Sequence, residues 1–161
     1  MKTKKISLSL FMIFLLILPC SLNVYASSGI SAQTVSDTIR ECAPLEFGYV
    51  DNTEYYMQYF FGGLSFADDS CIVVSAESTN FNEFGVFHVA NTKDIKKCEK
   101  ILKSYVEASL QRFKNGVVYD VGDYPKFENA AVVTVDDFVI YMILTPDQSE
   151  KATQLLQTLL R

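Results

Sequence analysis

The hydrophobic pattern is clearest between Ala130 and Leu144, where two apolar, β-branched runs flank the pair Asp136-Asp137. Such runs around a short polar pair predict two antiparallel strands joined by a turn. If the aspartates form the loop, one side of the ribbon is wholly apolar, with the cross-strand pairs Val135–Phe138, Val133–Ile140 and Ala131–Met142. The other side is apolar apart from two hydroxyl groups. A longer loop is the alternative, because the favoured two-residue turn needs positive φ at both positions.

Two long amphipathic helices are predicted from apolar residues at helical spacing. The first runs from a cap at Asn91 or Thr92 to about Lys114, with an inner stripe of Ile95, Cys98, Leu102, Tyr105, Val106, Ser109, Leu110 and Phe113. The second is capped by Thr145, has Pro146 in its first turn and a capping box closed by Gln148. Its apolar face is Ala152, Leu155, Leu156, Leu159 and Leu160. We expect this leucine face to cover the wholly apolar side of the hairpin.

Shorter elements complete the predicted fold. Helices are expected over 31–42 and from the capping box of Asp51 and Glu54 to Phe61. Strands are expected over 71–77 and 84–90, and an irregular crossing segment over 117–129. The resulting order, two short N-terminal helices and then β-β-α-β-β-α, predicts an α+β fold. We expect a two-layer sandwich in which a four-stranded antiparallel sheet has both long helices on one face. No repeat or linker suggests a second domain.

Residues 1–26 have the pattern of a signal peptide. Lys2, Lys4 and Lys5 precede the apolar run Ile6–Leu18, and Val24-Tyr25-Ala26 suits a signal peptidase. The run is shorter than the roughly 20 apolar residues of a membrane span. We expect cleavage after Ala26, with lipid attachment at Cys20 as the alternative. We expect residues 27–161 to form one extracytoplasmic domain, which is either secreted or associated with the cell surface.

The net charge limits the classes of partner that we expect, and the cysteine count limits the possible disulfides. The formal net charge is −5, and cleavage after Ala26 would make it −8 because three lysines are lost. This balance argues against nucleic acid and anionic lipid as partners. The cluster Lys93, Lys96, Lys97, Lys100 and Lys103 is interpreted as a solvated helix face. Cys42, Cys71 and Cys98 would remain after cleavage, and we favour three buried thiols over one disulfide.

The segment Tyr55-Tyr56-Met57-Gln58-Tyr59-Phe60-Phe61 allows two interpretations. The one we favour places these aromatic rings under the sheet, with the tyrosine hydroxyls reaching water. The alternative is a ligand surface for peptide or glycan, with candidate residues Tyr55, Tyr56, Tyr59 and Phe60. An exposed patch of these rings would support the alternative.

The sequence gives little support for catalytic or metal-binding residues. His88 is the only histidine, and we expect its ring to lie near a sheet edge and to bond backbone or water. The acidic pairs Asp68-Asp69, Asp120 with Asp123, and Asp136-Asp137 lack the spacing of a calcium loop, so turn chemistry explains them. No metal, cofactor or catalytic residue is predicted. The alternative is an exported thiol-dependent enzyme that uses Cys98 or Cys71 with His88.

Several segments together resemble one bacterial family. They are Glu83-Phe84-Gly85-Val86-Phe87-His88-Val89, Lys93-Asp94-Ile95-Lys96-Lys97, the helix with Arg112 and Phe113, Tyr124-Pro125, Phe127-Glu128-Asn129-Ala130, the hairpin and the last helix. Over about residues 53–160 the chain is similar to the domain of unknown function family 4358. The resemblance implies a small secreted protein or lipoprotein of Gram-positive bacteria and implies no catalytic residues. We therefore expect a secreted, non-enzymatic interaction or ligand-binding module at the cell envelope, whose partner is an envelope protein, peptide or glycan.

Overall fold

The structure is a computed structural model that describes residues 29–77, 79–116 and 120–160. The predicted signal peptide and Cys20 lie outside these residues. A five-stranded sheet with the strand order β1-β2-β3-β5-β4 forms the centre, and every neighbouring pair is antiparallel. The strands are β1 (Tyr49–Asp51), β2 (Asp69–Ser75), β3 (Glu83–His88), β4 (Ala131–Val135) and β5 (Phe138–Ile143). The α+β class is confirmed, but the predicted count of four strands is wrong, since the three-residue β1 is too short to leave an alternating pattern.

The β4–β5 hairpin confirms the predicted register. Val135 pairs with Phe138, and the pairs Val133–Ile140 and Ala131–Met142 follow along the ribbon. The two aspartates form the turn, and Asp136 adopts a positive φ of 54°. Aspartate is one of the few non-glycine residues that accept this conformation at modest cost, so the two-residue loop is retained.

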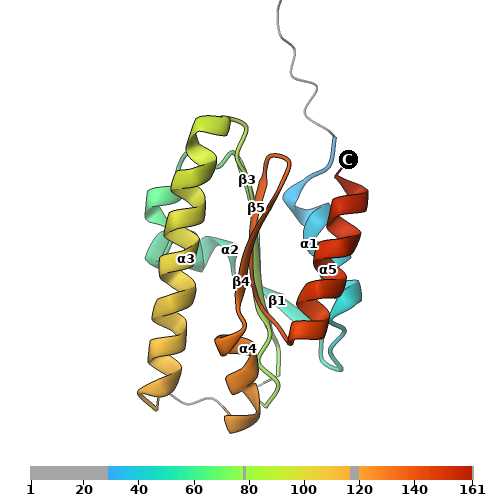
Figure 1. Ribbon diagram of the computed structural model, residues 1–161, viewed down its shortest axis with the longest axis vertical. Helices are drawn as coiled ribbons and strands as arrows, with labels where there is room; N and C mark the ends of the chain where they lie inside the picture. Colours follow the sequence, from blue (N-terminus) through green and yellow to red (C-terminus); the bar gives the residue numbers. More distant parts are fainter. Residues whose placement is uncertain (1–28, 78, 117–119, 161) are drawn as a thin grey trace, which may run out of the picture.

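Helices cover both faces of the sheet, which corrects the predicted two-layer arrangement. Figure 1 shows α3 (Thr92–Lys114) on one side of the sheet and α1 (Ala32–Cys42) with α5 (Pro146–Leu159) on the other. Each face has its own buried apolar cluster. All six residues of β5 are buried, so this strand needs cover on both sides, and one helix layer cannot provide it.

The cluster on the α5 side contains the apolar side of the hairpin, as predicted. Phe138, Ile140 and Met142 pack there with Ala152 and Leu156 of α5. The predicted capping box is present, since Thr145 accepts from Gln148 N–H and the Gln148 side chain accepts from Thr145 N–H. Leu155 and Leu159 nevertheless expose 41% and 38% of their surfaces. The buried face of α5 is therefore narrower than its leucine pattern suggested.

The opposite cluster lies beneath α2 (Thr53–Tyr59), α3 and α4 (Tyr124–Glu128). The predicted inner stripe of α3 is confirmed, with Cys98, Leu102, Tyr105 and Ser109 buried. The segment expected to be irregular contains α4, where Lys126 is buried and its Nζ lies 3.0 Å from Asp123 Oδ1. Among the helices described, none has the length and apolar character needed to cross a membrane.

Candidate functional site

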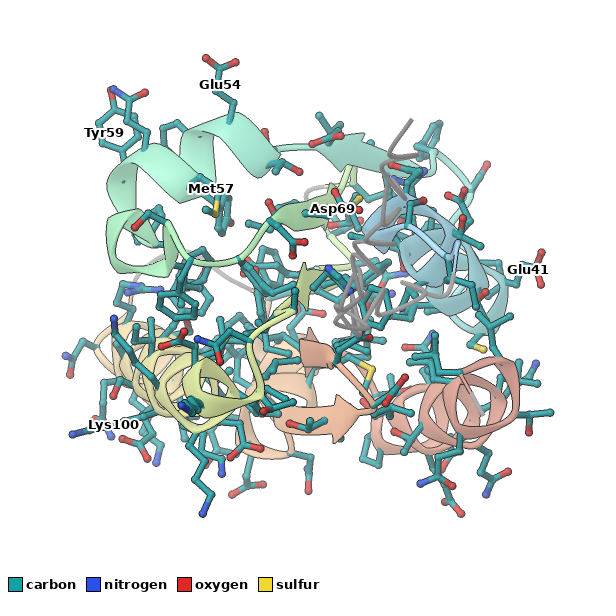
Figure 2. The ribbon with its side chains drawn as sticks, turned by 90° about the horizontal axis from the view of Figure 1, so that it is seen from above. Glu41, Glu54, Met57, Tyr59, Asp69 and Lys100 are labelled. Carbon is teal, nitrogen blue, oxygen red and sulfur yellow. The ribbon has the colours of Figure 1, made fainter. Side chains whose placement is uncertain are left out.

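Helix α2 presents aromatic side chains to solvent. Its start is fixed because Thr53 N–H donates to Asp51 Oδ1 at 2.8 Å and Thr53 Oγ1 accepts from Ile72 N–H of β2 at 2.8 Å. Tyr55, Tyr59 and Phe60 expose 54%, 63% and 44% of their surfaces. The interpretation that these rings lie under the sheet is therefore wrong for three of the four candidate residues. In Figure 2, Tyr59 projects away from the body of the protein, whereas Met57 points inward.

The short helix explains this division, because aromatics occupy positions all round it and only one side can face the sheet. Phe61, just after the helix, is fully buried, and Tyr56 is half-buried. The outer rings pack on one another, with the Tyr55 and Tyr59 centroids 4.8 Å apart and their planes tilted by 44°. Phe60 contacts Tyr56 at 5.2 Å and Tyr105 of α3 at 5.7 Å. The rings therefore form one connected aromatic surface that reaches α3.

A groove of about 520 Å³ continues this surface along α3. We call it the α2–α3 groove, and its lining residues are Phe60, Lys97, Lys100, Ile101, Ser104, Tyr105, Ala108 and Arg112. The positions on α3 are separated by one, three or four residues, so they form a single stripe of the helix. Lys97 Nζ also lies 4.5 Å from the centroid of the Phe66 ring, a cation–π contact. The groove thus combines aromatic, aliphatic and cationic side chains.

Beneath the groove, a buried carboxyl group is bonded by three phenols. Glu83 is 2% exposed, and its Oε1 accepts from Tyr105 at 2.6 Å and from Tyr141 at 2.8 Å. Its Oε2 accepts from Tyr56 at 2.9 Å. Burial raises the pKa of Glu83, although the phenols and Arg112 favour its charged form. Burial and the nearby Glu83 charge also raise the pKa of Tyr105. This network connects the sheet to Tyr56 of α2 and Tyr105 of α3, so it holds the groove walls in place.

Arg112 closes one end of the groove in a fixed orientation. Its guanidinium carbon lies 5.5 Å from the Tyr105 centroid and 5.8 Å from the Phe60 centroid. Its Nη2 donates to Ser109 Oγ at 2.7 Å. Contact with two rings and one hydroxyl restricts the rotamers of a long side chain, so the remaining N–H groups are presented in a defined plane.

The surroundings of His88 differ from the prediction. The residue ends β3, the middle strand of the sheet, and its Nδ1 lies 2.6 Å from Asp68 Oδ1 while Nε2 lies 2.8 Å from Asp137 Oδ2. The expected edge position and the expected bonds to backbone or water are therefore wrong. Burial lowers the pKa of His88, but the hydrogen bonds to the two aspartates outweigh it, so the pKa lies above its ordinary value. The imidazole joins the loop before β2 to the hairpin turn.

The three cysteines are free and buried, as preferred from the sequence. Cys98 belongs to the cluster beneath α3, and burial raises its pKa to about 12. Cys71 belongs to the cluster beneath α1 and α5, its thiol donates to Gln33 Oε1 at 3.4 Å, and burial raises its pKa as well. Both ring nitrogens of His88 bond carboxylates. Neither Cys98 nor Cys71 is therefore activated by His88 in this structure, as the alternative enzyme hypothesis would require.

The acidic pairs have structural roles in turns and caps. Asp69 Oδ2 accepts from Ala32 N–H at 2.7 Å at the start of α1, and Asp120 Oδ1 accepts from Gly122 N–H at 2.8 Å. Asp123 pairs with Lys126 and also accepts from Phe81 N–H. Within residues 29–77, 79–116 and 120–160, no group of three or more histidine, cysteine or acidic side chains could hold a metal ion.

Two features of the site differ from what the sequence pattern predicted. Glu83 was assigned no role, although a carboxylate at the start of an otherwise apolar strand is an available signal of a buried polar contact. Its partners Tyr56, Tyr105 and Tyr141 are far apart in sequence, so only the fold identifies them. Lys97 and Lys100 were interpreted as part of a solvated face, and they line the groove.

Comparison with known proteins identifies a family for this chain. Searches of curated proteins and of solved structures found no match to this chain. The model of a family described as a domain of unknown function, DUF4358, matches residues 56–144, which include the second half of α2, the buried Glu83 network, all of α3 and the hairpin. Because this match spans more than half of the chain, the protein belongs to the DUF4358 family.

Proposed function

We propose that the protein is a secreted, non-enzymatic binding module that acts at the cell envelope through the aromatic surface of α2 and the α2–α3 groove. The observation that carries this proposal is the joint exposure of Tyr55, Tyr59 and Phe60 beside a groove. Burial of a large aromatic ring is favourable in free energy. A connected group of such rings exposed at the surface is therefore characteristic of a contact site. Aromatic residues and arginine are also the residues most often found at energetically dominant contacts.

The ligand class consistent with this surface is a peptide, an envelope protein or a glycan. A test uses a random dodecapeptide phage library and a glycan array with the purified protein, followed by affinity measurements on each enriched ligand. We expect Tyr59→Ser to weaken binding by about tenfold or more, as for a central aromatic contact. Phe47→Ser is the matched control, because Phe47 is 71% exposed and lies outside α2 and the groove. Enriched ligands that bind Tyr59→Ser as well as the unchanged protein would contradict the proposed surface.

Export is a separate part of the proposal and has its own test. The leader predicted over residues 1–26 directs the chain across the membrane, where it is cleaved after Ala26. Expression of the full chain in a bacterial host, followed by mass spectrometry of the extracytoplasmic fraction, should give a product that begins at Ser27. A product that keeps residues 1–26 in the cytosol would contradict export, and a lipid-modified Cys20 would contradict the proposed cleavage site.

A further inference from the structure

We propose that the α2–α3 groove binds an acidic peptide segment of a partner protein, with apolar side chains alternating with glutamate or aspartate. This inference rests on the proposed function, since it assigns a ligand chemistry to the same surface. It follows from three properties of the groove: the lysines Lys97 and Lys100 without ion pairs to the described residues, its length with an apolar floor, and the fixed Arg112 guanidinium at one end.

Within the part of the chain that the structure describes, the cations of the groove form no ion pair with an acidic side chain at the protein surface. Among the described residues, no carboxylate lies within ion-pair distance of Lys97, Lys100 or Arg112. In contrast, Lys103 of the same helix lies 3.8 Å from Glu99. The residues that line the groove include no acid, although the whole chain has a formal net charge of −5. Lys97 and Lys100 therefore carry uncompensated positive charge, and Arg112 adds a third cation, which interacts with the buried Glu83. Together they produce a local positive potential on an acidic protein, which complements an anionic ligand.

The dimensions of the groove suit an extended peptide. Lys97 and Arg112 are fifteen positions apart on α3. At a rise of about 1.5 Å per residue the stripe is about 22 Å long, which matches about six residues of extended chain. Ile101, Ala108 and the Phe60 ring provide an apolar floor between the cations. Because successive side chains of an extended chain point to opposite sides, alternating apolar and acidic residues would meet the floor and the cations in turn.

The ring geometry favours a peptide over an acidic glycan. A sugar ring stacks on a flat aromatic face, but the exposed rings of Tyr55 and Tyr59 are tilted against each other by 44°, and Phe60 is tilted by 43° against the half-buried Tyr56. Tilted rings leave wedge-shaped gaps that aliphatic side chains can fill. Arg112, held by Ser109 and two rings, presents its free N–H groups to a carboxylate in the planar geometry that such a pair prefers.

The test measures the affinity of fluorescein-labelled hexapeptides by fluorescence anisotropy. The probe alternates glutamate and leucine, the uncharged control alternates glutamine and leucine, and the glycan competitor is a hexamer of galacturonic acid. We expect the glutamate peptide to bind about tenfold more tightly than the glutamine peptide. Each of the changes Lys97→Gln and Lys100→Gln should weaken binding about two- to fivefold, as for exposed ion pairs. Lys103→Gln is the matched control because Lys103 already pairs with Glu99, and it should have no effect.

Three results would overturn the inference: equal affinity for the two peptides, equal effects of Lys97→Gln and Lys103→Gln, or tighter binding of the galacturonic acid hexamer. Circular dichroism of each variant confirms that it is folded. If the glutamate peptide fails to bind while library ligands still depend on Tyr59, the acidic-peptide inference fails and the proposed function stands. If no ligand depends on Tyr59 or on the groove cations, both fail.

Discussion

Gly85 offers the sharpest test of how the buried network supports the site. A Cβ added at this position in β3 would overlap Cε1 of the Tyr141 ring and approach Ile72 Cγ1 to 3.1 Å. Tyr141 is fully buried, and its hydroxyl donates to Glu83 Oε1 at 2.8 Å. The ring therefore cannot move away without losing this hydrogen bond. Gly85→Ala should strain the core and disturb the Glu83 network together.

The expected cost follows from these contacts. Overpacking of a buried site costs about 1–3 kcal/mol. Loss of the Tyr141–Glu83 hydrogen bond adds about 1–2 kcal/mol. Alanine has less conformational entropy than glycine in the unfolded chain, which offsets about 0.5 kcal/mol of this cost. Gly85→Ala should therefore lower the free energy of unfolding by about 3 kcal/mol, which a domain with about 5–15 kcal/mol of stability can tolerate.

Urea denaturation followed by far-ultraviolet circular dichroism measures this cost, and the chain contains no tryptophan that would offer a fluorescence signal. The matched background is Tyr141→Phe, which keeps the ring but has no hydroxyl. There, Gly85→Ala should cost about 1–2 kcal/mol less, because no hydrogen bond to Glu83 remains to be lost. A cost below about 1 kcal/mol, or the same cost in both backgrounds, would refute the reasoning.

Two further predictions concern His88 and Cys98. The pKa of His88 is raised in the folded protein, so its contribution to stability is complete below the unfolded pKa of about 6.5 and is lost as pH rises through the folded pKa. Urea midpoints should therefore fall between pH 5.5 and 9 for the unchanged protein and should fall less for His88→Gln. Equal slopes of midpoint against pH for the two proteins would contradict the bonds to Asp68 and Asp137. Burial raises the pKa of Cys98 to about 12, so a variant that keeps only this cysteine should react with a disulfide reagent at pH 8 at least about a hundredfold faster in urea than when folded. Fast labelling of the folded variant would show that this thiol is accessible.

The local pattern was sufficient for the hairpin, the helix caps and the stripe of α3. Each depends on neighbours within a few residues, such as the capping box of Thr145 and Gln148. It also predicted that the apolar side of the hairpin lies under α5. The layer arrangement depends on which face each helix covers, and that choice is made by contacts between distant segments. Both faces of β5 are buried. The second side of the hairpin is also mostly apolar, which indicated cover on both faces, but the two-layer prediction did not take this into account.

The candidate site was predicted in part. The sequence singled out Tyr55, Tyr56, Tyr59 and Phe60, yet helical aromatics give the same pattern whether they are buried or exposed. Exposure was decided by Phe61, Met57 and Tyr56, which pack on the cluster over the sheet. The rings of Tyr55, Tyr59 and Phe60 are left outside. The His88 contacts could not be foreseen, because Asp68 and Asp137 reach the ring from two loops 20 and 49 positions away in the chain.

Mapping of a bound ligand by nuclear magnetic resonance tests most directly whether α2 and the outer stripe of α3 form the binding face. Amide shifts of the labelled protein would be followed during titration with the tightest ligand from the peptide library or glycan array. We predict that the largest changes lie in residues 53–60 and along the stripe from Lys97 to Arg112. Changes concentrated on α1 and α5, on the opposite side of the sheet, would contradict the proposed surface.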